Sequence, residues 1–380
     1  MSKLLEPIFS KADLHYCSVP VPDIEAHKGS QFSFTTEQIA AYGQGQTHPS
    51  IVYIEGGWNG HEYWMAITPY PKAEDVFENP CIYYGDADEN GNPPRIFHPI
   101  NGTANGEYTM INNPIVKVTS NKDVNSDPDL WFDPEGNNGN GVLYMISRWN
   151  GEPYGKYPTY VQQSIDGQSW TPRPTTPLVD GDVTFGTAQP SLLKVGNEFR
   201  IYGSSGGYQL RTDTSAIGNG CSGMGITAGS SLDQPFTFKK YCYFGGKRNI
   251  DPYHSDVFVD PKTGKFYVIF CAANYNIDEN QTRRLVYLAE SEDGENFHVF
   301  ARPLLGSYDT GMAYYRPTAC VRNSDRKIIV YWCTVSGCSK DAADYPNGDS
   351  DVPVDSRAVG VSYGDFDAIL SVLRNDRVTI

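Results

Sequence analysis

The sequence has no surplus of basic residues and no long apolar run, and each absence excludes a class of partner. Its 380 residues carry 45 acidic and 30 basic side chains, a formal net charge of −15. Because a protein that binds nucleic acid or an anionic membrane surface needs a basic face, we expect neither partner. The longest apolar stretches, such as Phe266–Ala273, have the length of a strand and are too short to cross a membrane.

The sequence also lacks the pattern of a secretory signal peptide and any CxxC pair. Charges interrupt every apolar run in the opening stretch MSKLLEPIFSKADLHY, and no small-residue cleavage site follows it. Without export, the eight cysteines are expected to be free thiols, and Cys271, Cys320 and Cys333 lie inside apolar, strand-like runs. A disulfide between Cys333 and Cys338 is the alternative that their spacing allows.

Aromatic side chains and turn-forming residues are abundant. Tyr, Phe and Trp make up 13% of the chain, beside 37 Gly and 26 Pro. Hydrophobic residues at 39% and charged residues at 20% are typical of a globular protein with a core. Because Gly and Pro favour turns, the composition indicates a β protein with many short connections.

An internal repeat organises most of the chain. Five segments share a polar residue, usually Pro, a small or acidic residue and then an alternating apolar strand, with 62 to 79 residues between successive copies. They are HPSIVY (48–53), DPDLWF (127–132), QPSLL (189–193), HSDVFV (254–259) and RPTACV (316–321). Each segment is followed by a turn and a second strand, which is the signature of a β-hairpin.

Third and fourth strands extend each repeat. The third-to-fourth connection recurs as SIDGQSW (164–170) and SEDGENF (291–297), where Asp-Gly suits a tight turn. Five units of four strands predict an all-β, five-bladed β-propeller with four antiparallel strands per blade. We expect a short N-terminal extension over residues 1–46, with a helical turn at Thr36–Tyr42, followed by the propeller over 47–380. The expected blades are about 47–118, 119–182, 183–247, 248–309 and 310–380.

The fourth strands are the least regular part of the repeat. We expect them at 95–100, 170–178, 236–244, 297–303 and 368–374. The last of these segments also fits helical spacing over Phe366–Leu373, but the register of the other blades favours a strand.

The repeat predicts which polar side chains meet in the channel, because the first strand of every blade lines it. Aligned on the proline, a first layer contains His48, Asp127, Gln189, His254 and Arg316. A ring of mixed acid, imidazole, amide and guanidinium groups suits a polyhydroxylated ligand.

A second layer lies one step further along the same strands. It contains Ser50, Asp129, Ser191, Asp256 and Thr318. The plainer interpretation of this layer is structural, because Ser, Asp and Thr after such a residue commonly hydrogen-bond the backbone.

Aromatic residues near strand ends add a second candidate feature of a sugar site. Trp58, Trp149, Tyr253 and Tyr315 are our candidates for stacking on sugar rings. The alternative is that most aromatic side chains pack between blades, where large residues fill the gaps.

The five inner-strand motifs and the S-x-D-G-x-x-[WF] hairpins resemble the five-bladed propellers of the arabinanase/xylosidase-type (family 43-like) glycoside hydrolases, over about residues 47–375. The stretch HPSIVY…GWNG…YWMAITPYP…ENP (48–80) also resembles first blades of propellers encoded by bacteriophages and bacteria. The resemblance implies a propeller fold and a glycan ligand. It also implies an inner-strand Asp as base or nucleophile, a second Asp that adjusts a pKa, and a Glu as acid.

The resemblance carries over only in part. His48 stands where the family has Asp before Pro, Asp127 matches an Asp-Pro motif, and the third blade has Gln189 and no Glu. The catalytic candidates are therefore Asp127, Asp256 and His48, with Glu78 as a further carboxylate for which a turn role is favoured. Asp129, Gln189, His254, Arg316 and the four aromatic residues are the substrate-binding candidates.

Two functions follow from this incomplete match. The favoured one is a glycan-binding propeller with degenerate catalytic residues that recognises bacterial surface carbohydrate as a virion-associated tail protein. The alternative is an active glycoside hydrolase with a non-standard Asp/His constellation. Either would be virion-associated or cytoplasmic. Neither requires a cofactor or a catalytic metal, although a structural Ca²⁺ in the channel is allowed, and residues 1–46 could mediate homo-oligomer or virion assembly.

Overall fold

The computed structural model describes most of the repeat units and part of the N-terminal segment. The residues described are 5–19, 33–34, 46–69, 78–100, 103–104, 107–109, 113, 115, 124–150, 158–180, 188–204, 224–246, 251–273, 285–306, 313–335 and 358–376. The expected helical turn at Thr36–Tyr42 and the residue Cys338 lie outside them.

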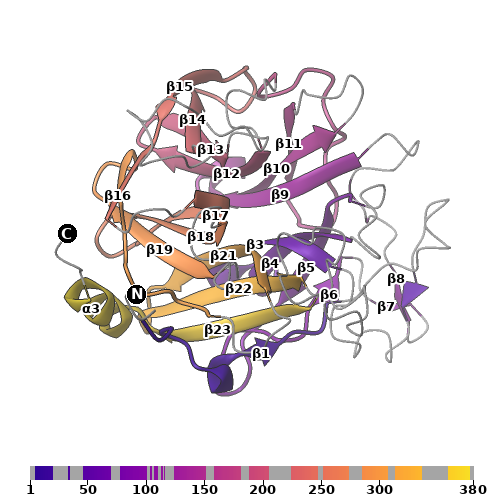
Figure 1. The fold of residues 1–380 in the computed structure, drawn as a ribbon. Helices are drawn as coiled ribbons and strands as arrows, with labels where there is room; N and C mark the ends of the chain where they lie inside the picture. The colour runs from indigo at the N-terminus through magenta and orange to yellow at the C-terminus, as the bar shows by residue number, and fades with distance from the viewer. Residues whose placement is uncertain are drawn as a thin grey trace, which may run out of the picture.

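The chain forms a five-bladed β-propeller, as the repeat predicts (Figure 1). Five inner strands surround the channel, and each packs against the inner strands of the neighbouring blades. They are β3 (Gln46–Trp58), β9 (Val124–Asp133), β12 (Ala188–Val195), β17 (Asp251–Val259) and β21 (Ala313–Arg322). All five contain the expected inner-strand motif, so the repeat identified the strands that line the channel.

Each inner strand is continued outward by antiparallel neighbours. The second strands are β4 (His61–Pro69), β10 (Val142–Asn150), β13 (Glu198–Ser204), β18 (Phe266–Ala273) and β22 (Lys327–Val335). The third strands are β5 (Cys81–Gly85), β11 (Thr159–Ser164), β14 (Met224–Gly229), β19 (Val286–Ser291) and β23 (Val359–Asp365). Three short strands, β2 (Ser33–Phe34), β7 (Thr103–Ala104) and β8 (Glu107–Thr109), form a separate small sheet.

The outermost strands differ from the prediction. Blades one, three and four have the fourth strands β6 (His98–Pro99), β15 (Thr237–Tyr241) and β20 (Asn296–Val299), and blade four gains β16 (Tyr243–Gly246), which runs parallel to β20. The expected strand at 170–178 is absent from the three-stranded second blade. An outer strand pairs on one side only, so the repeat determines its position less strictly than that of the inner strands.

The expected last strand, 368–374, is wrong: this segment is the helix α3 (Phe366–Asn375). Asp365 caps its N-terminus by accepting a hydrogen bond from the amide of Ala368 at 2.8 Å, and Phe366, Ile369, Leu370 and Leu373 are buried on one side. The segment forms a helix because these apolar residues recur at three- and four-residue intervals and face blades four and five.

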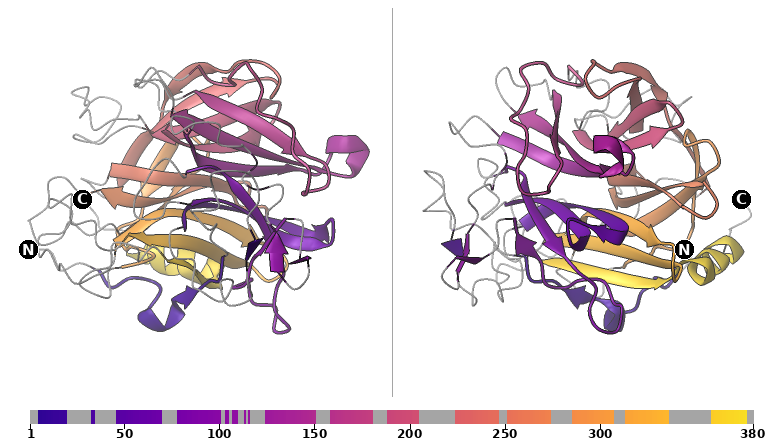
Figure 2. Two further views of the ribbon diagram at one scale, coloured as in Figure 1. Left: turned by 90° about the vertical axis from the view of Figure 1, so that its right-hand side faces the viewer. Right: turned by 180° about the vertical axis from the view of Figure 1, so that it is seen from behind.

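The fourth strand of blade five comes from the other end of the chain. β1 (His15–Tyr16) pairs antiparallel with β23, after a single 3₁₀ turn at Lys11–Asp13. Backbone hydrogen bonds continue the contact on both sides, from Phe9 to Leu304 in blade four and from Ser18 to Arg95 in blade one. The N-terminal segment therefore fastens three blades together, and Figure 2 shows it running along their outer edge.

The Asp-Gly connections form one recurring turn. Ser164 and Asp166 accept backbone amides of the turn, and Gly167 has a φ of 74°; Ser291, Asp293 and Gly294 (φ 70°) do the same in blade four. A Cβ on Gly167 would lie 2.1 Å from the Trp64 ring of the neighbouring blade, so glycine is needed for both conformation and space.

The aromatic excess is largely explained by the gaps between blades. Five buried clusters occupy the five interfaces, and their members come from adjacent blades. Trp64, Tyr202, Tyr287, Tyr331 and Trp332 are among the largest fully buried side chains. Six cysteines in the described residues are free thiols, as expected. No helix in the described part of the chain is both long and apolar enough to span a membrane.

Candidate functional site

The first-layer residues share an unusual backbone conformation. His48, Asp127, His254 and Arg316 have φ of 57°, 51°, 47° and 37°, in the left-handed region that non-glycine residues rarely adopt. The register of each inner strand against its second strand shifts at these points, as in a β-bulge. Such strained positions cluster at functional sites, and here they bring the side chains of blades one, two, four and five together.

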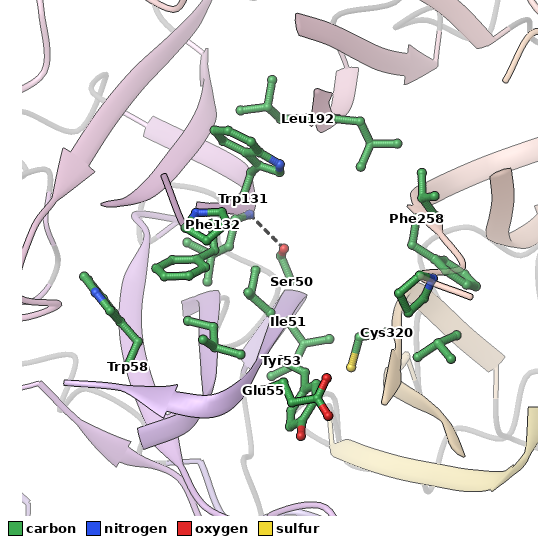
Figure 3. A pocket seen from close by; sticks show the side chains of 18 of the residues that line it. Ser50, Ile51, Tyr53, Glu55, Trp58, Trp131, Phe132, Leu192, Phe258 and Cys320 are labelled. Carbon is green, nitrogen blue, oxygen red and sulfur yellow. Dashed lines mark hydrogen bonds between the residues drawn. The ribbon is translucent and has the colours of Figure 1, made fainter. Parts of the chain in front are cut away.

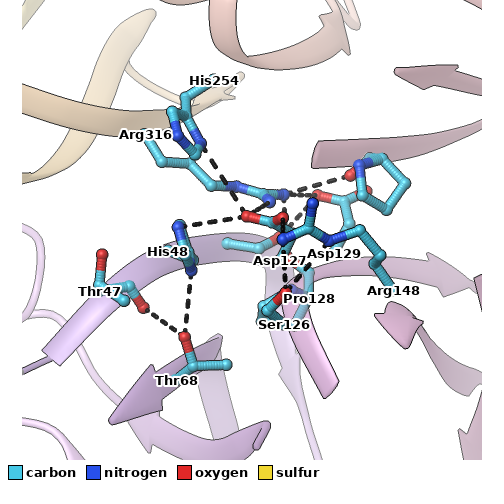
Figure 4. Close-up of polar contacts among 12 residues, drawn as sticks. Thr47, His48, Thr68, Ser126, Asp127, Pro128, Asp129, Arg148, His254 and Arg316 are labelled. Atoms are coloured by element: carbon cyan, nitrogen blue, oxygen red, sulfur yellow. Dashed lines mark hydrogen bonds and ion pairs between the residues drawn. The ribbon is translucent and has the colours of Figure 1, made fainter. Parts of the chain in front are cut away.

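Asp127 lies at the centre of this first layer (Figure 4). Its Oδ1 is 3.2 Å from His48 Nε2, 3.4 Å from Arg316 Nη1 and 3.9 Å from His254 Nδ1, and its Oδ2 is 3.0 Å from Arg148 Nη2. All of these side chains except Arg148 are at most 4% exposed. The result is a buried carboxylate surrounded by two imidazole rings and two guanidinium groups.

The charges around Asp127 decide its ionisation. Burial acts to raise the pKa of Asp127, but the charges of a protonated His48 and of the Arg148 and Arg316 guanidinium groups outweigh it, and its pKa lies below the usual range. The carboxyl group is therefore an ionised ligand at neutral pH.

A hydrogen-bond chain fixes the protonation of His48. The hydroxyl of Thr68 donates to the carbonyl of Thr47 at 3.2 Å, so it accepts a hydrogen bond from His48 Nδ1, also at 3.2 Å. The Glu78 carboxylate lies 3.3 Å from the same nitrogen. A proton on Nδ1 leaves the lone pair of a neutral His48 on Nε2, which faces Asp127 Oδ1.

Two electron-rich atoms 3.2 Å apart need a positive charge between them. That charge is a second proton on His48 or a bound cation. Ligand atoms of His48, Asp127 and His254 all lie within 4.8 Å of one another. Two imidazole nitrogens and a carboxylate oxygen are donor types that divalent first-row metal ions take in proteins. The donor set therefore fits a divalent metal ion, with Glu78 and Thr68 as outer partners that orient His48.

The second layer has a different arrangement, because its side chains bond from blade to blade. Ser50 donates to Asp129 at 2.9 Å, and Asp129 accepts the amide of Leu192 at 2.7 Å. Ser191 donates to Asp256 at 3.0 Å, and Asp256 accepts from the hydroxyl of Thr318 at 2.7 Å. The amide of Ile51 donates to that hydroxyl, so the bonds pass through all five blades.

The pKa values of the second-layer acids agree with this structural placement. Burial raises the pKa of Asp129 well above its usual value, and the nearby charge of Asp256 adds to the effect. Burial likewise raises the pKa of Asp256. The catalytic role expected for Asp256 stays a prediction. Its contacts in the described residues link blade four to blades three and five.

The second-layer hydrogen bonds that link the five blades are called the inter-blade ring below, and Ser50 offers a direct test of it. Its hydroxyl donates to Asp129 and accepts the amide of Leu130 at 2.9 Å, so Ser50→Ala leaves two buried groups without that partner. We expect a loss of about 1–3 kcal/mol in the free energy of unfolding, measured by urea denaturation. An unchanged midpoint would show that the ring contributes nothing to closure. Ser10→Ala, which also removes a side-chain hydrogen bond but at an exposed position, is the matched control.

The remaining expected site residues are scattered. Tyr315 lies 3.8 Å from the His254 ring and 5.3 Å from the His48 ring, between centroids. Trp149 faces Arg173 in blade two. Trp58 is buried at the opposite end of the channel, where it donates to the Asn140 carbonyl at 2.8 Å. The side chains of Gln189 and Tyr253 lie outside the described residues.

Arg148 and Thr68 are the two members of the site that sequence reasoning missed. Both lie on second strands, opposite the inner-strand motif: Arg148 pairs with Ser126, and Thr68 pairs with Thr47. The repeat could have found them, because the residue that pairs with an inner-strand position is predictable once the hairpin is known. Glu78, considered as a candidate but assigned to a turn, lies in the cluster.

The chain is a five-bladed β-propeller in which buried inner-strand side chains converge on Asp127. No family model matches the sequence. The chain is 24% identical over 298 residues to an A type blood N-acetyl-α-D-galactosamine deacetylase of Flavonifractor plautii. The match covers 70% of this chain and 37% of that protein, so the chain spans little more than a third of the relative's length.

Solved structures show the same architecture. An N-acetylgalactosamine deacetylase from F. plautii, in complex with blood group B trisaccharide, superposes with a TM-score of 0.67 at 17% identity, over 96% of this chain and 98% of that one. The GH43_1 enzyme of Xanthomonas citri, complexed with xylotriose, gives a TM-score of 0.53 at 10% identity over 89% and 91%. An α-L-arabinofuranosidase of Podospora anserina, in complex with cellotriose, gives 0.52 at 12% over 94% and 98%.

Proposed function

We propose that this protein is a metal-dependent deacetylase that removes the acetyl group from an N-acetylated amino sugar. The observation that carries the proposal is the convergence of His48, Asp127 and His254, whose ligand atoms lie within 4.8 Å of one another in a buried site. The similarity to a protein named as an N-acetyl-α-D-galactosamine deacetylase supports the choice of reaction and of substrate class.

The donor set suits a catalytic ion more than a structural one. Two imidazoles and one carboxylate leave coordination positions open for water and substrate, whereas structural zinc sites are closed by four protein ligands. Ca²⁺ prefers six to eight oxygen ligands, which makes the structural calcium allowed by the sequence a poor fit here. A divalent ion in such a site polarises an amide carbonyl and activates water.

The chain's own residues supply orientation and proton transfer. Thr68 and Glu78 hold a proton on His48 Nδ1, which directs Nε2 toward the ligand position. Arg148 and Arg316 keep Asp127 ionised. Glu78 is a second carboxylate beside His48; its assigned role is to hold the proton on Nδ1, and a role as general base for the attacking water is the alternative that Glu78→Gln tests. The oxygen of the attacking water bonds to the acetyl carbon, the amide C–N bond breaks, acetate leaves, and the proton given up by the water passes to the sugar nitrogen.

The two interpretations made from the sequence stay predictions. A glycoside hydrolase needs two carboxyl groups that flank the scissile bond, and Asp129 and Asp256 are both engaged in the inter-blade ring. A binding protein with degenerate catalytic residues, virion-associated or otherwise, would have no need of a buried set of metal ligands. Under the deacetylase proposal, the carboxylates of a glycoside hydrolase are missing because the protein catalyses a different reaction. The proposal therefore does not require that catalysis was lost.

The proposal is tested with N-acetyl-α-D-galactosaminides and the isolated protein loaded with Zn²⁺ or Mn²⁺. We expect release of acetate, with the glycosidic bond intact by mass spectrometry. Dialysis against a chelator is expected to lower the rate to background, and the added ion to restore it. Metal analysis of the protein before and after dialysis gives a readout independent of turnover.

Each alternative gives a different product. Release of free sugar in place of acetate would show a glycoside hydrolase, and tight glycan binding with no product would show a binding protein. Acetate release that survives complete removal of metal would overturn the assignment of His48, Asp127 and His254 as ligands.

A further inference from the structure

The channel has a cavity on the side of the inter-blade ring away from Asp127. This far cavity has a volume of about 660 Å³ and is lined by the second halves of the five inner strands (Figure 3). Among its lining residues are Asp129 and Asp256 of the ring, but none of His48, Asp127, His254 and Arg316. The far cavity is therefore separate from the metal-ligand cluster.

The walls of the far cavity are apolar and aromatic. Tyr53, Trp131, Phe132, Phe258 and Cys320 surround it, and their side chains are drawn around an open space in Figure 3. Four of the five are partly exposed even though they lie on central strands, because the cavity leaves their faces uncovered. A volume of this size and a largely apolar lining are typical of small-molecule sites.

The titratable groups of known position that line the far cavity are acidic or are tyrosine and cysteine, and none is basic. Asp129 and Asp256 lie on the side of the inter-blade ring, and the exposed Glu55 is on the inner strand of blade one. No lysine, arginine or histidine is among the described residues that line it. An anionic ligand would therefore meet repulsion, while a cation would meet acidic groups and electron-rich ring faces.

We propose that the far cavity binds an apolar organic cation, such as an aromatic amine. The apolar body would lie against Trp131, Phe132 and Phe258, and the positive charge would be directed toward the acidic groups. Glu55 is the exposed carboxylate of the lining and is the group assigned to the positive charge, because Asp129 is bonded to Ser50 and Leu192 and lies 3.8 Å from the Arg316 guanidinium. The chemical class of the proposed ligand is inferred only from the residues that line the far cavity and from their charge. It does not rest on the deacetylase proposal.

The test compares three probes with one indole body and different charge, measured by isothermal titration calorimetry on the full chain. We expect tryptamine to bind about tenfold more tightly than uncharged 3-ethylindole, and indole-3-propionate to bind more weakly than both. Equal affinity for all three, or no binding by tryptamine, would overturn the proposal.

Two substitutions locate the binding site. Val259→Trp fills the far cavity and is expected to abolish tryptamine binding, whereas Ile165→Trp, at a residue 56% exposed elsewhere on the surface, should leave it unchanged. If Val259→Trp does not fold, Val52→Phe fills the cavity from blade one. Tryptamine binding that survives cavity filling, or that disappears in His254→Asn, would place the probe elsewhere and overturn the proposal.

Discussion

Under the proposed function, replacing His254 with Asn is expected to lower the rate of acetate release about 10³-fold and to lower the metal content of the protein. The substitution deletes one of the three proposed ligands, and an ion used as a Lewis acid contributes several kcal/mol to transition-state stabilisation. Asn is the suitable replacement because it tolerates the left-handed conformation that His254 adopts at a φ of 47°. The measurements are the rate of acetate release and the metal content of the purified protein.

Folding of this variant is expected to change little. The contacts of Asp127 with Arg148 and Arg316 remain, so no buried charge is left uncompensated. His61→Asn is the matched control, since His61 contacts Asp86 on the outside of blade one and takes no part in the cluster. A His254→Asn protein that keeps full activity and metal would remove His254 from the ligand set.

A graded response separates ligands from the residues that orient them. Glu78→Gln keeps a hydrogen-bonding side chain beside His48 but removes the charge. If Glu78 only orients His48, Glu78→Gln is expected to lower metal affinity or activity about 10–100-fold. A loss of turnover with the metal affinity unchanged would instead identify Glu78 as the proton acceptor.

The inner half of the propeller could be predicted from the sequence because a channel imposes the same requirement on every blade. Each inner strand must present a polar residue to the axis and apolar residues to its neighbours, so the motif recurs from His48 to Arg316. That regularity also identified the first layer. It could not show that the residue before proline adopts a positive φ, which is what turns His48 and Asp127 toward one another.

The outer half could not be predicted in the same way. An outer strand pairs on one side only, so any segment with a free edge and a fitting apolar face can take the position. In blade five the Ala368–Arg374 segment follows its helical period, and residues from the N-terminus take the vacant edge of β23. Pairing between residues more than 300 positions apart leaves no local signal in a single sequence.

Deletion of residues 1–19 is expected to destabilise the propeller strongly. The segment buries Phe9, Cys17 and Val19, each at most 4% exposed. At about 2 kcal/mol for each large apolar side chain, their loss approaches the whole stability of an ordinary domain. Deletion also exposes the edge of β23, which is a template for aggregation. We expect low recovery of soluble protein and a melting temperature lowered by more than about 10 °C where any is obtained.

The N-terminal segment acts as a separable strand, which makes its effect reversible in trans. A peptide of residues 5–19 added to the truncated protein should restore the hydrogen bonds from Ile8 to Pro303 and from Cys17 to Val359. We expect the peptide to raise the melting temperature in a concentration-dependent way, because it binds only the folded state. A peptide with Phe9→Ala should restore about 3–5 kcal/mol less of the free energy of unfolding. A truncated protein as stable as the full chain would show that blade five closes without β1.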